Sequence, residues 1–213
     1  MLIDLTNPIQ SVIPSAHGAV LSVLARTDEP LSGRRIAELT RPRFAQTQVN
    51  RVLRRLAASG VVLLERRPPS NLYRLNRDHV AAEGIQTLAR MWATLVARIR
   101  AELETWSVPP QAAWLFGSAV RGEATEQSDI AIFLVLPTDG SEEIGSVWDR
   151  QTKVLTEKIT AWSGNPCEVT EMDAAELRAA VERDDRLIRD LREHAVALAG
   201  SDPRALLRRE VLG

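Results

Sequence analysis

Small and polar residues between two apolar segments have the types and spacing needed to bind a phosphate. The segments, residues 112–116 and 130–136, are of strand length and rich in branched or aromatic side chains. Gly117 and Ser118 directly follow the first segment. Their backbone N–H groups and the hydroxyl can face an anion, because residue 117 has no Cβ to obstruct it. Asp129 begins the second segment, so its carboxylate can face the same pocket.

Residue 131 decides what that carboxylate can do. Side chains alternate along a strand, so positions 129 and 131 lie on one face. A second carboxylate at position 131 would complete a clamp for divalent cations, but the residue there is Ala131. The alternative interpretation is an ordinary hairpin, in which Asp129 caps a turn of a polar loop.

The spacing around these residues resembles that of the minimal nucleotidyltransferases of the DNA polymerase beta superfamily. Their motif is Gly-Ser, ten residues and Asp-x-Asp, often with Arg-Gly soon after the Ser. The spacing of this chain matches that motif, and the resemblance extends loosely from residue 95 to residue 198. The second Asp of the motif is missing. The matching residues are Gly117-Ser118, Arg121-Gly122 and, ten residues after Ser118, Asp129-Ile130-Ala131.

The resemblance implies two Mg²⁺ ions and an NTP as substrate, with in-line attack of a hydroxyl on the α-phosphorus. It implies that Asp129 binds metal together with an acidic residue from a neighbouring strand. Residues 166–172 offer Glu168 on one face of that strand and Glu171 on the other. The strand register of the family favours Glu168.

Phosphate contacts are implied in the same way for Gly117 and Ser118, with Arg121 as a charge-assisted contact. The missing carboxylate at Ala131 should weaken metal binding and misplace the α-phosphate. A misplacement of about 1 Å can cost roughly a hundredfold in rate. Two explanations of Ala131 stay open: a natural relative that keeps the fold without catalysis, and an active enzyme inactivated by an Asp-to-Ala change.

The first 80 residues predict three helices and a hairpin. A helix is expected from Ser15 onward, and a short strand before it, around residues 2–5. Ser32 is a predicted N-cap for a second helix, Gly33–Leu39. Apolar residues at helical spacing predict a third helix over residues 45–59. Residues 61–67 and 72–76 then predict a two-stranded hairpin, and this order resembles a winged helix-turn-helix.

The charge of this segment favours contact with a polyanion such as DNA. Residues 1–80 hold twelve arginines against six acidic residues, whereas the whole chain has a net charge of −1. The alternative is a small helical domain used for dimerisation, with a solvated polar face. The predicted DNA-contacting residues lie at the turn, on the third helix and in the hairpin: Arg41, Arg43, Gln46, Thr47, Asn50, Arg51, Arg54, Arg66 and Arg67.

The remaining residues predict one long helix followed by an α/β domain. Apolar residues recur every three or four positions over residues 81–106. Helices are expected over residues 142–162 and 187–193, and strands over residues 166–172 and 195–199. The predicted fold is therefore a winged-helix domain (1–80), a linking helix (81–108) and an α/β (α+β) nucleotidyltransferase domain with a mixed sheet (109–213).

Composition excludes several other classes of protein. One cysteine permits no intrachain disulfide, the three histidines have no zinc-like spacing, and no apolar run is long enough to cross a membrane. We therefore expect a cytoplasmic protein without membrane association, and a homodimer is left open.

The resemblance implies Mg²⁺-dependent transfer of NMP from an NTP to a hydroxyl of an RNA or protein acceptor. It also suggests a toxin–antitoxin-like system. The activity is expected to be weakened or absent with Ala131 in place. The alternative is a DNA-binding transcriptional regulator whose inactive transferase domain senses nucleotide.

Overall fold

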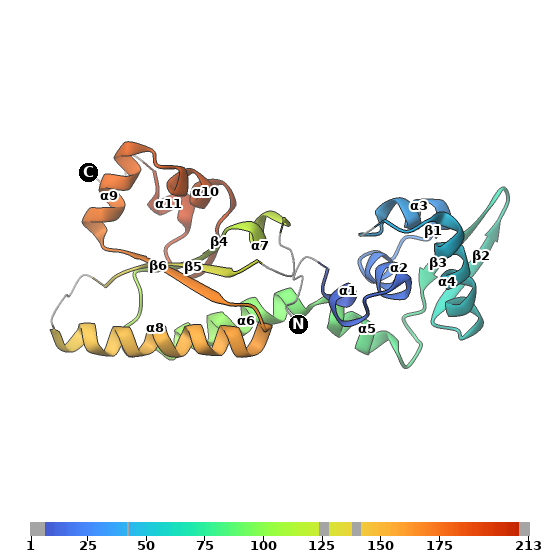
Figure 1. Cartoon of the computed structure of the whole chain (residues 1–213), viewed down its shortest axis with the longest axis horizontal. Helices are drawn as coiled ribbons and strands as arrows, with labels where there is room; N and C mark the ends of the chain where they lie inside the picture. The colour runs from blue at the N-terminus through green and yellow to red at the C-terminus, as the bar shows by residue number, and fades with distance from the viewer. Residues whose placement is uncertain (1–6, 42, 124–127, 138–141, 209–213) are drawn as a thin grey trace. The chain divides into compact units, whose positions relative to one another are not determined.

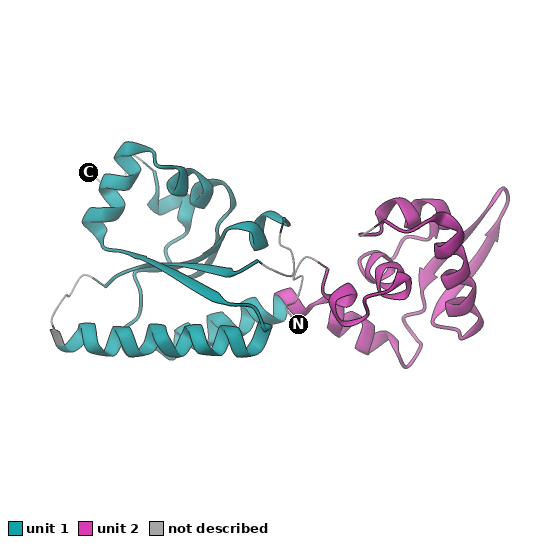
Figure 2. Cartoon of the chain, viewed as in Figure 1, with its two compact units in different colours: residues 1–6, 93–213 teal, residues 7–92 magenta. Residues whose placement is uncertain are grey.

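The chain divides into two compact units (Figure 2). One is formed by Asn7–Trp92, and the other holds Ala93–Gly213. The computed structural model describes residues 7–41, 43–123, 128–137 and 142–208. The strand expected around residues 2–5 lies outside the described residues.

The first unit contains helices and a small antiparallel sheet of order β1-β3-β2. Strands β2 and β3 form a hairpin in which Arg67 pairs with Ser70. The expected order of helices and hairpin is therefore present in the structure, while the winged-helix assignment stays a prediction. The elements are α1 (Pro8–Val12), α2 (Ala16–Ala25), β1 (Leu31–Ser32), α3 (Gly33–Leu39), α4 (Gln46–Ala58), β2 (Val62–Arg67), β3 (Ser70–Leu75) and α5 (Ala82–Ala89).

Local sequence signals explain where these helices begin and what they bury. The Ser32 hydroxyl accepts a hydrogen bond from the Arg35 N–H at 3.2 Å, which confirms Ser32 as the N-cap of α3. The apolar stripe of α4 is fully packed, with Val49 and Leu53 at 0% exposure. These side chains join residues of α2, α3 and the hairpin in one core.

The predicted long helix over residues 81–106 is interrupted. It consists of α5 and α6 (Met91–Glu104), and the break lies at Arg90, where ψ is 7°. The two helices pack into different cores. Ile85 of α5 packs against the core of the first unit. Buried residues of α6, such as Ile99 and Leu103, belong to the second unit. The apolar periodicity was continuous across this boundary, so sequence could not place the break.

The second unit is built on a four-stranded mixed sheet of order β6-β5-β4-β7 (Figure 1). Strands β5 and β6 are parallel, whereas β4 is antiparallel to both β5 and β7. This confirms the predicted mixed sheet. The strands are β4 (Ala112–Phe116), β5 (Ile130–Val135), β6 (Cys167–Met172) and β7 (Val196–Gly200), and the helices are α7 (Ser118–Arg121), α8 (Glu142–Ser163), α9 (Ala174–Arg183), α10 (Arg186–His194) and α11 (Pro203–Leu206).

Helices cover both faces of this sheet. Figure 1 shows α6 and α8 on one side and α9, α10 and α11 on the other. Trp114 and Phe133 stack on the second side, with ring centroids 5.4 Å apart, against buried residues of α9 and α10. Because helices cover both faces of the sheet, its central strands are almost wholly apolar. Among the described residues, no helix is both long and apolar enough to cross a membrane.

Candidate active site

The sheet register brings the motif residues together. Phe116, the last residue of β4, pairs with Ala131, and Ala131 pairs in turn with Glu168 of β6. Paired residues of neighbouring strands share a face of the sheet. Glu168, Ala131 and the end of β4 therefore lie side by side across three strands, on the side covered by α9 to α11. Asp129, two residues before Ala131, belongs to the same face by alternation.

Gly117 turns the chain from β4 into the short helix α7. Its φ of 82° and ψ of −159° lie in a region that is essentially restricted to glycine. The N–H groups of Val120 and Arg121 then donate to the Gly117 carbonyl at 3.2 and 3.3 Å. A Cβ at residue 117 would lie 3.4 Å from the Ala131 Cβ, so this turn borders the motif position directly.

The two carboxylates are held on adjoining backbone segments. The Asn165 side-chain amide donates to the Ser128 carbonyl at 3.0 Å, and the Ile130 N–H donates to the Pro166 carbonyl at 2.8 Å. These bonds tie the segment containing Asp129 to the start of β6. Asp129 is half-buried, whereas Glu168 is exposed.

Cys167 stands beside these carboxylates but is not a nucleophile. Burial raises the pKa of its thiol to about 12, and the negative charges of Glu168 and Asp129 add to that effect. Only the thiolate reacts readily, so at neutral pH this side chain is an inert thiol.

Arg121 makes contacts that differ from the predicted one. Its Nε donates to Glu123 Oε2 at 2.8 Å, and its Nη1 donates to Asp190 Oδ1 of α10 at 2.7 Å. The hydrogen bond to Glu123, followed by that to Asp190, raises the pKa of Arg121, and burial opposes this. Two of its N–H groups thus bind carboxylates in the structure.

Residues 96–201 match the family model described as "Nucleotidyltransferase domain". The match begins within α6 and spans the motif loop and all four strands of the second unit's sheet. This part of the chain is similar to nucleotidyltransferase domains. The resemblance inferred from Gly117, Ser118 and Asp129 is thereby confirmed at the level of the domain family.

A comparison with curated proteins finds no match. Among solved structures, two that are similar to the chain are crystal structures of toxin–antitoxin proteins. One is described as a toxin–antitoxin with AMP-PNP; it is 21% identical, with a TM-score of 0.36, over 53% of this chain and 80% of the other. The second is a mutant of the toxin–antitoxin MntA–HpeT, 16% identical, with a TM-score of 0.35, over 55% of this chain and 79% of the other. Similarity at this level does not indicate what this chain acts on.

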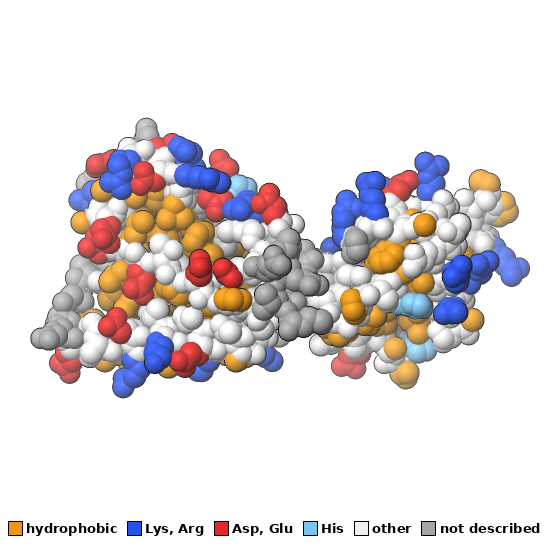
Figure 3. Space-filling view, in the orientation of Figure 1, with side chains coloured by type: hydrophobic (Ala, Val, Ile, Leu, Met, Phe, Trp, Pro, Cys, Tyr) orange, Lys and Arg blue, Asp and Glu red, His pale blue; other side chains and the backbone are white. Residues whose placement is uncertain are grey.

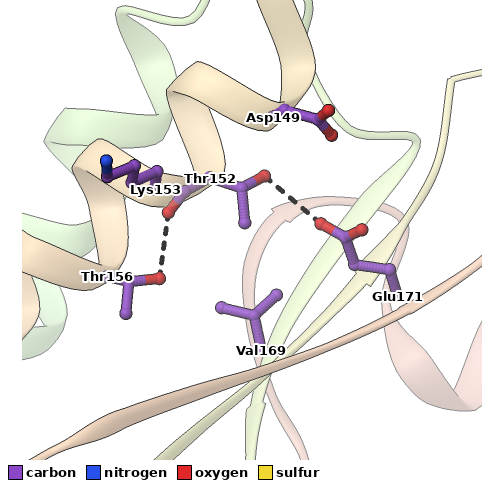
Figure 4. Close-up of a pocket in the computed structure, with 6 residues that line it drawn as sticks. All are labelled: Asp149, Thr152, Lys153, Thr156, Val169 and Glu171. Carbon is purple, nitrogen blue, oxygen red and sulfur yellow. Dashed lines mark hydrogen bonds between the residues drawn. The ribbon is translucent and has the colours of Figure 1, made fainter. Parts of the chain in front are cut away.

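Glu171, the other acidic residue of β6, lies on the opposite face of the nucleotidyltransferase sheet. Its carboxylate accepts hydrogen bonds from Trp148 Nε1 at 2.9 Å and Thr152 Oγ1 at 3.2 Å. Figure 4 shows it directed toward α8 in a pocket that also contains Asp149 and Lys153. Glu171 therefore anchors α8. Glu168 is the acidic residue of β6 on the other face, which also carries Asp129 and Ala131 and is called the motif face below.

The carboxylates on the motif face suit one magnesium ion better than a bridged pair. Mg²⁺ is commonly held by one or two carboxylates together with substrate phosphates and water, which Asp129 and Glu168 can supply. A bridged pair needs a further oxygen ligand, and Ala131 provides none. The described part of the chain contains no group of three or more His, Cys, Asp or Glu side chains placed to hold a metal.

The predicted DNA-contacting residues of the first unit fall into distinct environments. Gln46, Asn50, Arg54 and Arg66 line a groove between α3, α4 and the hairpin, together with Arg34, which was not among the predicted residues. None of the residues that line this groove is acidic. Figure 3 shows Lys and Arg side chains beside α3 and around α4 and the hairpin. The other predicted residues Arg41, Arg43, Thr47 and Arg51 are exposed.

Two of the predicted residues, Asn50 and Arg67, also make contacts within the first unit. The Asn50 side-chain oxygen packs so closely on Gly33 that a Cβ there would overlap it. Arg67 forms an ion pair with Glu65 at 3.4 Å, and Arg74 binds the other oxygen of the same carboxylate at 3.4 Å. Asn50 therefore helps to pack α4 on α3, and Arg67 offers less net positive charge than Arg66.

Proposed function

We propose that the nucleotidyltransferase domain binds an NTP at the motif face and transfers NMP to a hydroxyl of a macromolecular acceptor, RNA or protein, with Mg²⁺. The observation that carries this proposal is the alignment of the Gly117 turn, Ala131 and Glu168 across three adjacent strands. In that alignment the Gly117 turn, which we propose binds phosphate, adjoins the face that carries Asp129 and Glu168. Membership of a toxin–antitoxin-like system stays a prediction of the sequence resemblance.

Each residue has a defined part in the proposed transfer. The acceptor oxygen forms a bond to the α-phosphorus while the bond from that phosphorus to the bridging oxygen breaks, and pyrophosphate leaves. Asp129 and Glu168 orient the reacting groups, and exposed Glu168 can accept the proton of the hydroxyl. Bound Mg²⁺ would neutralise phosphate charge. Ala131 leaves this arrangement one carboxylate short, so the proposed activity is low in this sequence.

Nucleotide binding is expected to persist without turnover. The Ser118 hydroxyl and the turn after Gly117 do not depend on residue 131, so the chain should bind NTP in the presence of Mg²⁺. Ser118→Ala should weaken binding by about tenfold, because a hydrogen bond to a charged group contributes about 1.5–3 kcal/mol. Titration calorimetry of the full chain measures this change.

A matched control is Ser146→Ala on α8, whose hydroxyl donates only to the Glu143 carbonyl of its own helix. That variant should bind NTP like the parent protein. Equal affinities for all three proteins would place the nucleotide away from the motif face.

A second function, DNA binding, is supported by the basic groove of the first unit. Arg54 and Arg66 line it, and neither has a carboxylate partner among the described residues. An anionic backbone with regularly spaced phosphates would satisfy these charges. Binding of duplex DNA through this groove would make the chain a regulator whose nucleotidyltransferase domain senses nucleotide, the alternative that the sequence left open.

Adjacent hairpin arginines provide the test of DNA binding. Arg66→Ala should weaken binding of a duplex and reduce the slope of log affinity against log salt by about 0.9, the value for one phosphate contact. Arg67→Ala should change the slope less, because Arg67 does not line the groove and pairs with Glu65. Gel shifts with the DNA upstream of the gene, at several salt concentrations, measure both. Equal effects of the two substitutions would contradict binding at the groove.

A further inference from the structure

Helix α7, which carries the Ser118 hydroxyl, is too short to hold its own position. α7 is four residues long, and Ala119 is its buried residue. Such a single turn gains little from its own hydrogen bonds, since nucleating a helix is unfavourable. It is bounded by Gly117 and Gly122, which both have positive φ. Its position must therefore come from contacts with other elements.

Arg121 supplies such a contact at the end of the turn. Residues three apart lie on the same side of a helix, so the side chains of Arg121 and Ser118 are neighbours on α7. The Arg121 guanidinium binds Asp190 at 2.7 Å, across 69 residues of sequence. This side-chain pair is partly shielded, with 29% exposure for Arg121 and 23% for Asp190.

The partner helix of this ion pair is firmly packed. Ile188 and Leu191, on either side of Asp190, are fully buried in the core shared with β4 and β5. His194, one turn later on α10, has its Nδ1 3.4 Å from the same Asp190 oxygen. Glu123 binds the Nε of Arg121 from the other side at 2.8 Å. The guanidinium is thus clamped between a rigid helix and the segment that follows α7.

We infer that Asp190 is a positioning residue of the nucleotide site: by binding Arg121 it fixes the α7 turn to α10 and so sets the place of Ser118. This inference rests on the proposed function, because the proposed ligand of Ser118 is the triphosphate. Arg121 then acts as a brace between two elements, and its contribution to nucleotide binding passes through the backbone of α7.

If the Asp190 carboxylate is removed, a bracing role of Arg121 and a direct phosphate contact of Arg121 predict opposite changes in NTP affinity. If Arg121 bound phosphate directly, removing the competing carboxylate would free its guanidinium and keep or increase NTP affinity. If Arg121 is a brace, the same change loosens α7 and lowers NTP affinity. Because the two residues act as one unit, their effects should also be non-additive.

The experiment compares full-length Asp190→Asn, Arg121→Ala and the double variant by NTP titration with Mg²⁺. Each single change is expected to weaken binding by about fivefold, and the double variant no further. Asp185→Asn is the matched control, since Asp185 also pairs with an arginine, Arg183 at 3.0 Å, but not with α7. Unchanged or tighter binding by Asp190→Asn would overturn the inference.

Amide hydrogen exchange of residues 117–123 without nucleotide separates this inference from the proposed function. Asp190→Asn should speed exchange of these amides severalfold relative to Asp185→Asn, whether or not NTP binds. If the parent protein binds no NTP, the proposed function fails, and faster exchange still supports the brace. Unchanged exchange in Asp190→Asn overturns the brace in either case.

Discussion

Ala131→Asp is expected to raise NMP transfer by at least about a hundredfold, the scale of the loss caused by a 1 Å misplacement of reacting groups. Position 131 pairs with Glu168 and shares its face, and Asp129 lies two residues earlier on the same face. A carboxylate there would lie between the two existing ones. Three carboxylates on one face could then hold two cations and the α-phosphate, which two cannot.

The assay follows labelled NTP with total RNA and total protein from the source cell as acceptors, with and without Mg²⁺. Ala131→Asn is the matched control, because it has nearly the same size as Asp but no charge. Adding Glu168→Gln to Ala131→Asp should remove the gained activity, whereas adding Glu171→Gln should affect mainly the packing of α8. No labelled product from Ala131→Asp, beside an active nucleotidyltransferase, would favour the regulator function.

Short-range patterns predicted most of the fold. The capping residue Ser32, the apolar stripe of α4 and the two strand-length segments that flank the motif depend on residues close in sequence, and each was located within a residue or two. The capping box of α9, in which the Asp173 side chain accepts from the Glu176 N–H, is a local signal of the same kind. Hydrophobic periodicity and helix caps are local properties, so one sequence is sufficient to recognise them.

Long-range contacts explain what sequence could not predict. The motif implied a phosphate contact for Arg121, and no spacing signal in the sequence indicated that its guanidinium also binds Asp190, 69 residues away. Asn50, predicted to contact bases because it faces away from the apolar stripe, lines the groove and also packs on Gly33, a contact that the sequence did not indicate. A polar residue on the outer face of one helix is solvent-exposed only if no second helix covers it, which depends on tertiary packing.

The charge pairing within the hairpin is a further contact between residues that the sequence did not predict. In the sequence, Arg66 and Arg67 are equivalent basic residues of one predicted strand. Strand alternation places them on opposite faces, and Glu65 and Arg74 share the face of Arg67. A count of arginines therefore overestimates the net positive charge of this hairpin.

Gly117→Ala is expected to reduce any transfer by the Ala131→Asp protein by about a hundredfold, through the position of Ser118. With φ at 82° and ψ at −159°, residue 117 occupies a conformation that costs a non-glycine residue about 1–3 kcal/mol. The added Cβ would also lie 3.4 Å from the Ala131 Cβ, which leaves little room for adjustment. The turn should therefore rotate to relieve the strain and move the hydroxyl that follows it.

Gly122→Ala is the matched control for that substitution. Gly122 also has positive φ, 72°, but in the left-handed helical region, where alanine costs only about 1 kcal/mol. A Cβ there has nothing within 4 Å among the described residues. Both substitutions should lower the melting temperature by a few degrees, and only Gly117→Ala should weaken NTP binding in titration, by about tenfold as for Ser118→Ala. If Gly122→Ala lost binding equally, the loss would reflect general weakening of α7, and Gly117 would have no particular role in placing Ser118.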